Sequence, residues 1–436
     1  MLMMREIFWV CKKKWSGNIE HLSKVIYMSE FFNLTSPDSA SKFMISQLAV
    51  ISDEIVDTEK SYGRIISRDY ESSDNLPPYA RSSMDGYSVR ASDTYGASDS
   101  LPAYLEVIGE IPMGTLATIA IKSGESAVSH TGGMIAKNAD AVVMLEQTEI
   151  TENGLLEVYK PVSVGENIVP IGDDFLKGSD VVSKGQMVDA GIIGSLLTNG
   201  ITNCNVYRKP VVGICSAGDE LVDPSVNPQP GQVRDINLYT IAAACETLPV
   251  EIKLYPRQKD DFQQQFAVAK NSIDECDVLI FTSGSSVSSR DLTSKVVESL
   301  GEPGVLIHGL TIKPGKPTVL GLVSNKPIIG LPGNPVSALT IFDIVAKPII
   351  LGLAGLSNPL HRPIVSGNLV ENVASLTGRT DYIRVKLVKK TDEVNVQPVL
   401  GMSNSISTIL KSDGYIEIPS DVSGLYAGAD VQVFLD

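Results

Sequence analysis

The stretch His308–Ser337 reads HGLTIKPGKPTVLGLVSNKPIIGLPGNPVS and predicts a strand, a tight loop and the start of a helix in succession. The apolar run Pro327–Leu331 indicates the strand, and the PGNP segment after it indicates the loop. Asn334 is a preferred helix-capping residue and Pro335 suits the first helical position, so a helix is expected over Val336–Ala346. Free backbone N–H groups at such a helix start favour the binding of an anion.

Two lysines precede this strand and strengthen the prediction of an anion site. Pro314 and Gly315 hold Lys313 and Lys316 apart, and Pro317 closes the turn. The chain as a whole carries a net charge of −15, so these lysines are not part of a general basic surface. Together with the helix start they suit an oxyanion or a phosphorylated ligand.

The composition limits the class of protein. A chain of 436 residues is too long for one ordinary core, so two to four domains are expected. It is 43% hydrophobic and 20% charged, as globular proteins are, and its acidity argues against nucleic acid or an anionic membrane as a partner. The sequence contains no run of about 18 apolar residues, so no membrane span is predicted.

The five cysteines and four histidines are scattered along the chain. Because there is no CxxC pair, a structural zinc site is not expected, and we interpret the thiols as free and buried in a reducing cytosol. The protein is therefore predicted to be cytoplasmic. Any metal ion is expected to be held by carboxylates, which Mg²⁺ prefers.

Residues 1–28 differ in charge from the rest of the chain, with five basic against two acidic residues and both tryptophans, Trp9 and Trp15. The apolar piece Ile7–Val10 is too short for the core of a signal peptide. We interpret the segment as an extension before a functional start at Met28. A membrane- or partner-binding arm is the alternative.

Periodic patterns divide the rest of the chain. Residues 38–71 show apolar residues at helical spacing and predict a helix. Residues 83–172 show short strands and turns that indicate a small β-rich domain. From residue 211 onward, short buried strands alternate with helices, which predicts a parallel sheet with helices on both faces. After about residue 359 the short strands return and indicate a compact β-domain.

Three loops follow strands of this sheet, so they are expected to converge at the edge where the parallel strands have their carboxyl ends. Ligands bind outside this edge in such sheets. The loops are SAGDEL (216–221), TSGSSVSSRD (282–291) and LPGNPVS (331–337). Glu220 and Asp291 lie in the first two loops, and Asp260 opens a nearby helix, so three carboxylates could hold Mg²⁺ against a phosphate. Each acid taken alone could equally be a helix cap or a solvated loop residue.

The second of these loops also supplies neutral donors. Ser283, Gly284 and Ser286 offer hydroxyl and backbone N–H groups to a phosphate or a polar heterocycle. No Walker-type loop and no GxGxxG follow a strand, so neither common class of nucleotide-binding protein is indicated. The sequence lacks a GxSxG elbow, so a Ser-His-Asp hydrolase is not supported.

A second group of candidate residues lies in the N-terminal half. Asp85 stands in a tight turn within PPYARSSMDGYSVR, Thr131 follows His130 in HTGG, and Asp174 lies in GENIVPIGDDFLKG. Each of these positions could also be an ordinary turn with a purely structural role.

Taken in order, these segments resemble one family. The segments SMDGYSVR, HTGG, ADAVVMLEQTE, GDDFLKG, SAGDEL, DVLIFTSGSS, IKPGKP, GLPGNPVSA and GRTDY are similar to motifs of the molybdopterin molybdenumtransferases, which are related to the E domain of gephyrin. The resemblance covers roughly residues 30–436. Ser283 and Ser288 replace glycines of many relatives, Ala217 replaces a usual threonine, and the usual proline-containing turn after TG is missing.

The resemblance implies a multidomain α/β plus β fold, with a parallel-sheet molybdopterin-binding domain, an inserted β-domain, an elongated linker domain and a C-terminal β-barrel. The expected parts are an extension of unknown role at 1–28, elongated domain I at 29–71 and 173–208, inserted β-domain II at 72–172, molybdopterin-binding α/β domain III at 209–358, and β-barrel domain IV at 359–436. It also implies a homodimer whose active site lies in a cleft between subunits.

The implied reaction inserts molybdate into adenylylated molybdopterin and releases AMP, with Mg²⁺ or another divalent ion, and molybdopterin adenylyltransferase is the implied upstream partner. The implied catalytic residues are Asp85, Thr131, Asp174, Glu220, Asp260 and Asp291, of which Glu220, Asp260 and Asp291 are also the implied metal ligands. The expected substrate-binding residues are Ser283, Gly284, Ser286, Lys313, Lys316, Pro332, Gly333, Asn334, Pro335 and Ser337. The first three catalytic residues would come from the partner subunit's side of the cleft.

Two alternatives remain open at this point. A non-catalytic molybdopterin-binding or scaffold protein is favoured by the altered Ser/Gly loop and disfavoured by the intact carboxylates. A molybdopterin adenylyltransferase is disfavoured because its α/β domain would here be set within an elongated framework. Molybdate and tungstate both suit the lysine pair, since both are tetrahedral dianions of nearly equal size.

Overall fold

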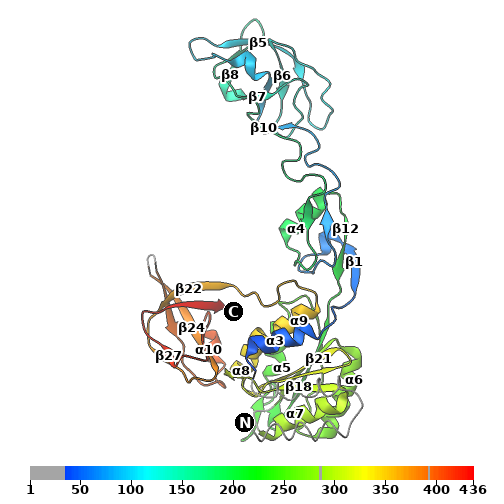
Figure 1. Ribbon diagram of the computed structural model, residues 1–436, viewed down its shortest axis with the longest axis vertical. Helices are drawn as coiled ribbons and strands as arrows, with labels where there is room; N and C mark the ends of the chain where they lie inside the picture. Colours follow the sequence, from blue (N-terminus) through cyan, green and yellow to red (C-terminus); the bar gives the residue numbers. More distant parts are fainter. Residues whose placement is uncertain (1–34, 284–286, 391–392) are drawn as a thin grey trace, which may run out of the picture.

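The computed structural model describes residues 35–283, 287–390 and 393–436. Figure 1 shows an elongated chain in which an arm joins the α/β domain to a distal β-domain, while a C-terminal β-barrel lies beside the α/β domain. This arrangement of α/β and β parts confirms the fold class predicted from the sequence. The extension predicted at residues 1–28 lies outside the described residues.

The α/β domain is built on a six-stranded sheet of order β16-β13-β17-β21-β20-β18. Its strands are β13 (Val211–Ala217), β16 (Glu251–Leu254), β17 (Val278–Ser283), β18 (Pro303–His308), β20 (Val319–Val323) and β21 (Lys326–Leu331), and the short strands β14 (Leu221–Val222) and β15 (Val233–Arg234) pair beside it. Its helices are α5 (Asn237–Cys245), α6 (Phe262–Glu275), α7 (Val287–Leu300), α8 (Pro335–Ile341) and α9 (Lys347–Leu353), with a π-helical turn at Phe342–Ala346 between the last two.

The alternation of buried side chains along β17 explains why helices cover both faces of the sheet. Val278 and Ile280 belong to the core on the side of α5, α8 and α9, whereas Leu279 and Phe281 belong to the core on the side of α6 and α7. Successive side chains of a strand point to opposite faces, so four consecutive apolar residues supply both cores. The predicted covering of both faces is confirmed.

One edge of the sheet differs from the prediction of parallel strands. The strands β16, β13, β17 and β21 are parallel, but β20 pairs antiparallel with both β21 and β18 and therefore runs in the opposite direction to the other strands. The turn between β20 and β21 consists of Ser324 and Asn325, whose φ angles are 51° and 63°. Two residues with positive φ form the turn that matches the twist of an antiparallel hairpin. The parallel part of the sheet is the part whose carboxyl ends carry the predicted loops.

The helix predicted over residues 38–71 is wrong beyond its first part. Helix α3 spans Pro37–Ser46, where Ala40 and Met44 are fully buried against the core of the α/β domain. The chain then leaves this domain and forms β1 (Asp53–Asp57), on which Ile55 is 69% exposed. The apolar residues at helical spacing in this second half serve a strand that pairs with β12, a partner far away in the sequence.

The arm consists of two antiparallel strand pairs and one helix. These elements are β1 with β12 (Asn203–Tyr207), β2 (Tyr70–Glu71) with β11 (Asp180–Val182), a 3-10 turn at Thr58–Lys60, and α4 (Ala190–Thr198). Leu196 of α4 packs with Val182, Cys204 and Val206 in a small core of the arm itself. The arm is thus made of two chain segments that flank the distal β-domain in the sequence.

The distal β-domain contains a six-stranded sheet of order β7-β4-β6-β5-β9-β8, which confirms the short strands expected over residues 83–172. Its strands are β4 (Gly86–Val89), β5 (Ala103–Glu110), β6 (Glu125–Ser129), β7 (Ala141–Met144), β8 (Thr148–Ile150) and β9 (Leu155–Val158), with 3-10 turns at Ala91–Thr94 and Leu145–Gln147. The pair formed by β3 (Arg81–Ser82) and β10 (Ile168–Val169) leads toward the arm.

The C-terminal domain is a closed barrel, because β24 pairs with both β25 and β26 in the ring β24-β25-β22-β28-β26. Its elements are β22 (Ile364–Leu369), β24 (Thr380–Lys390), β25 (Glu393–Pro398), β26 (Gly414–Ile418), β28 (Asp430–Leu435), the short pair β23 (Val373–Ala374) and β27 (Gly424–Leu425), and α10 (Ser407–Leu410). Strand β19 (Ile312–Lys313) adds to β24 in parallel and so attaches the lysine-bearing loop to the barrel.

The helical stretch Pro335–Leu353 is long and apolar enough to cross a membrane, with a mean hydropathy of 1.8, although no such segment was expected from the sequence. Within the protein, however, 83% of this stretch is buried. Helix α8 packs against α5, and α9 packs against α3. We therefore interpret it as the core helix of the α/β domain.

Candidate functional site

Two loops meet at the carboxyl end of β13 because the chain after β16 continues the sheet there. The Gly218 N–H donates to the Gln258 carbonyl at 3.1 Å, and the Gln258 N–H donates to the Ser216 carbonyl at 2.9 Å. This pairing places Asp260 beside the acids of SAGDEL, and its N–H donates to Asp219 Oδ1 at 3.3 Å. The structure thus brings together carboxylates that lie some forty residues apart in the sequence.

The environment of Asp260 favours a bound cation. Burial, and next the negative charges of Glu220 and Asp219, raise the pKa of the Asp260 carboxyl above its ordinary value. Its Oδ1 is buried and has no hydrogen-bond partner. An unpaired buried carboxylate oxygen among like charges is costly, and a divalent ion would compensate it with the oxygen ligands that Mg²⁺ prefers. Glu220 and Asp260 therefore fit the predicted role as metal ligands.

The neighbouring acid, Asp261, has a different and purely structural role. It is the N-cap residue of α6, and its Oδ1 accepts a hydrogen bond from the Gln264 N–H at 2.9 Å. The two consecutive acids that open this helix are thus divided between a cap and the candidate site.

The third predicted metal ligand, Asp291, lies in α7, but its side chain is outside the part of the chain that the structure describes. Among the described side chains, no group of three His, Cys, Asp or Glu residues is arranged to hold a metal ion. Gly284 and Ser286 also lie outside the described residues, and of Ser283 only the backbone is described, at the end of β17. Ser288 lies within α7, so its backbone is helical.

A cavity of about 390 Å³ opens next to Glu220, across the carboxyl ends of the parallel strands. Thr282 at the end of β17 and the turn Gly333–Pro335 before α8 also line it. Asn237, which sequence reasoning missed, donates from Nδ2 to the Gly333 carbonyl at 2.8 Å and fixes that turn. Its Oδ1 is buried without a partner. The acidic side chain of Glu220 and the turn at the start of α8 thus line the same cavity.

The start of α8 is only partly available to an anion. Asn334 occupies the N-cap position and Pro335 the first helical position, as predicted, but the Asn334 side chain does not cap the helix. Its Nδ2 instead donates to Ser403 Oγ of the barrel at 2.9 Å, and the Val336 N–H donates to the Ser403 carbonyl at 3.1 Å. The barrel therefore satisfies one of the N–H groups that were expected to bind an anion.

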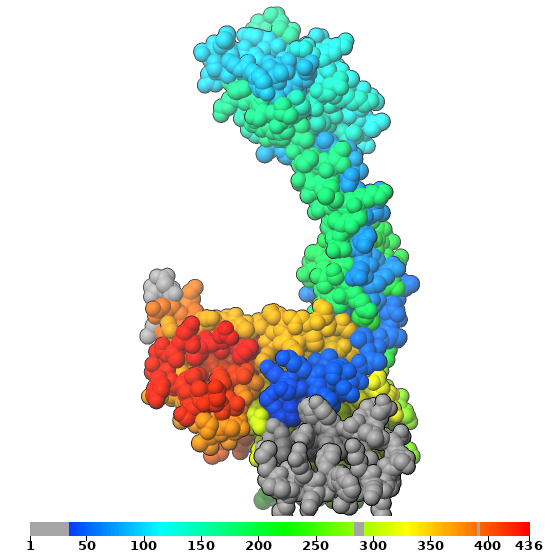
Figure 2. Space-filling model, viewed as in Figure 1, coloured from blue at the N-terminus to red at the C-terminus, as the bar shows by residue number. Residues whose placement is uncertain are grey.

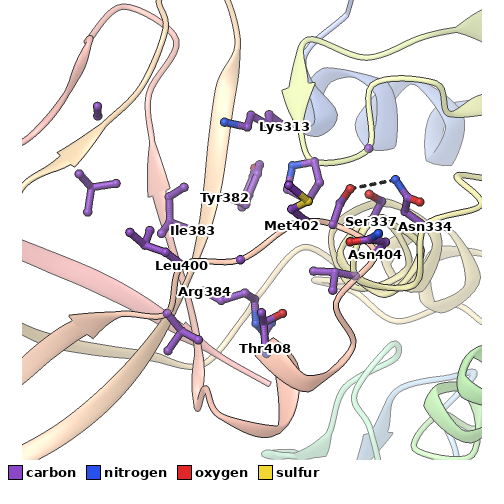
Figure 3. Close-up of a pocket in the computed structure, with 18 of the residues that line it drawn as sticks. Lys313, Asn334, Ser337, Tyr382, Ile383, Arg384, Leu400, Met402, Asn404 and Thr408 are labelled. Atoms are coloured by element: carbon purple, nitrogen blue, oxygen red, sulfur yellow. Dashed lines mark hydrogen bonds between the residues drawn. The ribbon is translucent and has the colours of Figure 1, made fainter.

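A larger cavity, of about 930 Å³, lies between the α/β domain and the barrel. Figure 3 shows Lys313, Asn334 and Ser337 on one side of it, and Tyr382 and Arg384 on strand β24 of the barrel. Asn334 and Asn404 line both this cavity and the smaller one. The two cavities are therefore neighbours, and an extended ligand could occupy both.

The two predicted lysines line a third cavity of about 310 Å³, between the loop Leu310–Lys316 and the barrel segment Leu376–Arg379. The lysine loop is closed by backbone hydrogen bonds, from the Leu310 N–H to the Lys316 carbonyl at 2.9 Å and from the Gly309 N–H to the Thr318 carbonyl at 2.8 Å. Lys313 also lines the cavity of about 930 Å³, so the cationic loop contributes to two of the cavities described above.

Sequence reasoning missed the barrel residues of the site. Arg379, Tyr382 and Arg384 line these cavities, and Asn404 lies in a loop between β25 and β26. Arg379 and Tyr382 fall within the motif GRTDY, whose residues were given no roles, and Arg384 follows two residues later. Strand alternation alone does not indicate which end of a barrel faces another domain, so only this motif could have pointed to them.

The predicted residues of the N-terminal half form a separate group. Asp85 Oδ1 accepts a hydrogen bond from the Thr131 N–H at 2.8 Å, and this bond holds the pKa of Asp85 below its ordinary value. Asp174 lies in a turn whose N–H donates to the Leu76 carbonyl at 3.0 Å, and all three residues are exposed. Figure 2 shows open space between the distal β-domain and the barrel, so one chain does not unite this group with Glu220 and Asp260.

Comparison with known proteins agrees with this architecture. Residues 35–200 match the model of the MoeA N-terminal region (domain I and II), residues 213–352 match a probable molybdopterin binding domain, and residues 367–435 match the MoeA C-terminal region (domain IV). A crystal structure of a molybdopterin biosynthesis MoeA protein from Pyrococcus horikoshii is similar with a TM-score of 0.75 and 34% identity, and it covers 92% of this chain and 99% of that chain.

Curated relatives agree as well. A Methanocaldococcus jannaschii protein named for molybdopterin biosynthesis is 34% identical over 92% of this chain and 98% of its own length. A molybdopterin molybdenumtransferase of Staphylococcus aureus is 30% identical over 86% of this chain and 90% of its own length. The fold is that of a protein of molybdenum cofactor biosynthesis. The chain belongs to the molybdopterin molybdenumtransferase (MoeA) family of enzymes.

Proposed function

We propose that this enzyme inserts molybdate into adenylylated molybdopterin and releases AMP. The observation that carries the proposal is the continuity of the cavities, from the acids at the end of β13, past the start of α8, to the cationic loop at the barrel. A ligand with an adenylate at one end and a dithiolene at the other needs an acidic metal-binding end and a cationic oxyanion end.

At the acidic end, Glu220 and Asp260 would hold the divalent ion, with Asp291 as the third proposed ligand. Mg²⁺ bound there would polarise the phosphoanhydride and offset the charge of the departing AMP. The residues of the chain position the nucleotide: Thr282 lies at the end of β17, and the turn Gly333–Pro335 lies across the same cavity. Holding the reactants in one geometry lowers the entropic part of the barrier.

At the cationic end, Lys313 and Lys316 would receive the substrate oxyanion. Molybdate and the dithiolene are both anionic, so the protein must hold them against their repulsion. Two ammonium groups supply that attraction from a loop that is closed by backbone hydrogen bonds, so little backbone freedom is lost on binding. Pro332 and Ser337 would shape the start of α8, where Ser337 is 3% exposed and lines the cavity of about 930 Å³.

The proposed active unit is a homodimer in which Asp85, Thr131 and Asp174 of one subunit complete the site of the other. Support comes from the separation of the two residue groups within one chain and from the exposure of all three residues. We further propose that the enzyme acts in the cytoplasm and receives its substrate from a molybdopterin adenylyltransferase, with neither nucleic acid nor a membrane as a partner. The net charge of −15 is consistent with that choice of partners.

The first test is the release of AMP from purified adenylylated molybdopterin with Mg²⁺, with and without molybdate. The transferase is expected to release AMP only with molybdate and to form active cofactor. Tight binding of the adenylate without AMP release would instead indicate a binding protein. Formation of the adenylate from molybdopterin and ATP would indicate an adenylyltransferase.

The dimer proposal predicts complementation between inactive variants. Asp85→Ala and Glu220→Gln homodimers are each expected to be nearly inactive. A random mixture of the two should regain about one quarter of wild-type activity, since half the dimers are mixed and each mixed dimer has one intact site. The measurement is molybdate-dependent AMP release after co-refolding of equal amounts of both variants. If the mixture stays as inactive as its parents, the two groups do not meet across subunits.

A further inference from the structure

Asp381 of the barrel is a buried carboxylate to which the proposed reaction assigns no role. It is 0% exposed, and among the described residues Asp235 is the one other acid that is buried to this degree. The Asp235 carboxylate accepts from the Ser216 hydroxyl at 2.6 Å, from Arg257 Nε at 3.2 Å and from the Leu238 N–H at 3.4 Å. The Asp381 carboxylate has a single hydrogen bond, which it accepts on Oδ1 from Arg379 Nε at 2.8 Å.

The other oxygen, Oδ2, has no hydrogen-bond partner and stands 3.8 Å from Lys313 Nζ. A buried carboxylate is stabilised only if its charge is compensated, so the ammonium of Lys313 and the guanidinium of Arg379 share that task. Lys313 belongs to the α/β domain and Arg379 to the barrel. Asp381 thus holds one cation from each domain.

The backbone fixes this arrangement. Strands β19 and β24 pair in parallel, with Ile312 opposite Thr380 and Lys313 opposite Asp381. The Thr380 N–H donates to the Thr311 carbonyl at 2.9 Å and extends the pairing by one residue. The position of Asp381 beside Lys313 is therefore set by the sheet register and not by the flexible lysine stem.

Both cations held by Asp381 face the same cavity. Lys313 and Lys316 line one wall of the 310 Å³ cavity, and Arg379 lines the other, while Asp381 lies behind the wall and does not line it. Three cations and one carboxylate give this group a net charge of +2. That charge matches a tetrahedral dianion, and the guanidinium adds directional donors to the point charges of the lysines.

We propose that Asp381 is a positioning residue that aligns Lys313 and Arg379 toward this cavity so that they bind the tetrahedral oxyanion substrate together. The inference rests on the proposed function, because it assigns the oxyanion of that reaction to this cavity. Asp381 does not touch the oxyanion; it acts through the two cations that it holds.

Removal of its charge would have two opposite effects on oxyanion binding. The net charge of the group would rise to +3, which favours an anion, but the attraction is weak where the cations are solvated, and the Lys313 side chain is 57% exposed. The lysine and arginine would also lose the partner that restricts their rotamers, and both side chains have large conformational entropy. We expect the loss of alignment to outweigh the gain in charge.

The test uses the full-length enzyme and the near-isosteric variant Asp381→Asn, with sodium molybdate and sodium tungstate as probes in isothermal titration calorimetry. We expect the Kd of both oxyanions to rise about 10-fold, the size of effect seen when groups that orient ligand-binding side chains are removed. In the AMP-release assay the KM for molybdate should rise in parallel, while the KM for adenylylated molybdopterin stays within two-fold of wild type, about the scatter of such a measurement.

Asp277→Asn is the matched control. Asp277 forms a two-fold ion pair with Arg208, with both N–O distances 2.6 Å, at the opposite end of the sheet from the cavities. This variant also loses a structural ion pair and should lower the melting temperature, but it should leave the Kd of molybdate unchanged. A common structural effect would instead change both variants alike.

Three outcomes would overturn the inference. Binding by Asp381→Asn that is as tight as wild type, or tighter, would show that Asp381 does not align the cations, even if molybdate-dependent AMP release is normal. An equal loss of binding in Asp277→Asn would assign the effect to stability. If the wild-type enzyme binds neither oxyanion, both this inference and the proposed function are wrong.

Discussion

Asp260→Asn is expected to lower the rate of molybdate-dependent AMP release by about 100-fold and, at the same time, to stabilise the metal-free enzyme. The negative charges of Glu220 and Asp219 repel the Asp260 carboxylate, and its Oδ1 has no hydrogen-bond partner. An amide of the same shape removes the repulsion, but it also removes a ligand from the proposed metal site. Function and stability should therefore move in opposite directions.

The sign of the stability effect follows from the pKa of Asp260, which is raised above its ordinary value of 3.8. A carboxyl that holds its proton more tightly in the folded state loses stability as the pH rises above that ordinary value. At pH 7 the wild-type carboxylate is therefore destabilising. The melting temperature of Asp260→Asn in EDTA should exceed that of wild type, and the difference should shrink as the pH is lowered toward 3.8.

Mg²⁺ should reverse this order. A ligand that binds only the folded state raises the melting temperature, so wild type should gain more from Mg²⁺ than Asp260→Asn does. Asp261→Asn is the control, since asparagine caps a helix as well as aspartate and this residue caps α6. It should change neither activity nor the response to Mg²⁺. Full activity of Asp260→Asn would show that Asp260 is not a ligand of the proposed metal site.

Gly315→Ala is expected to destabilise the α/β domain by about 2–4 kcal/mol and to displace the lysine loop. Gly315 has a φ of +108°, which side-chain-bearing residues rarely adopt. A Cβ at this position would stand 2.5 Å from both Cδ1 and Cγ1 of Ile341, a fully buried residue of α8. Either α8, most of whose residues are buried, or the loop between Lys313 and Lys316 must move.

Hydrogen exchange and oxyanion titration together measure this effect. Protection of amides in β21 and α8 should fall, and the Kd of molybdate should rise at least 10-fold, because both lysines shift relative to the cavity. Gly428→Ala is the control: Gly428 has a φ of +85° but open space where the Cβ would be. Gly428→Ala should lower the free energy of unfolding by only about 1 kcal/mol, because it strains the backbone without a steric clash. It should leave oxyanion binding unchanged. Wild-type affinity in Gly315→Ala would show that the lysine positions do not depend on this close packing.

Local sequence patterns predicted much of the α/β domain. Short buried strands were expected from residue 211 onward, and one of them, Val278–Phe281, supplies both cores of the sheet. The helix after Pro335 begins where Asn334 and Pro335 placed it. These features depend on residues close together in the chain, so their signal is contained in short windows.

Other features depended on contacts that no short window contains. The helix predicted over residues 38–71 ends at Ser46, and the chain beyond it forms β1 against β12, because pairing across the arm decides its structure. Asn334 is of a residue type that often caps helices, but its side chain donates to Ser403 instead, because the barrel packs against the start of α8.

The sequence by itself determined which groups are candidates for the site: the acids Glu220 and Asp260, the lysines Lys313 and Lys316, and the turn before α8 all stand in short segments that follow strands. Only the tertiary structure decided how these groups are combined. The pairing of the chain after β16 with the end of β13 brings Asp260 to Asp219, and the pairing of β19 with β24 brings Asp381 to Lys313. Both juxtapositions arise from backbone hydrogen bonds between distant segments, and residue type and spacing within a segment do not encode such register.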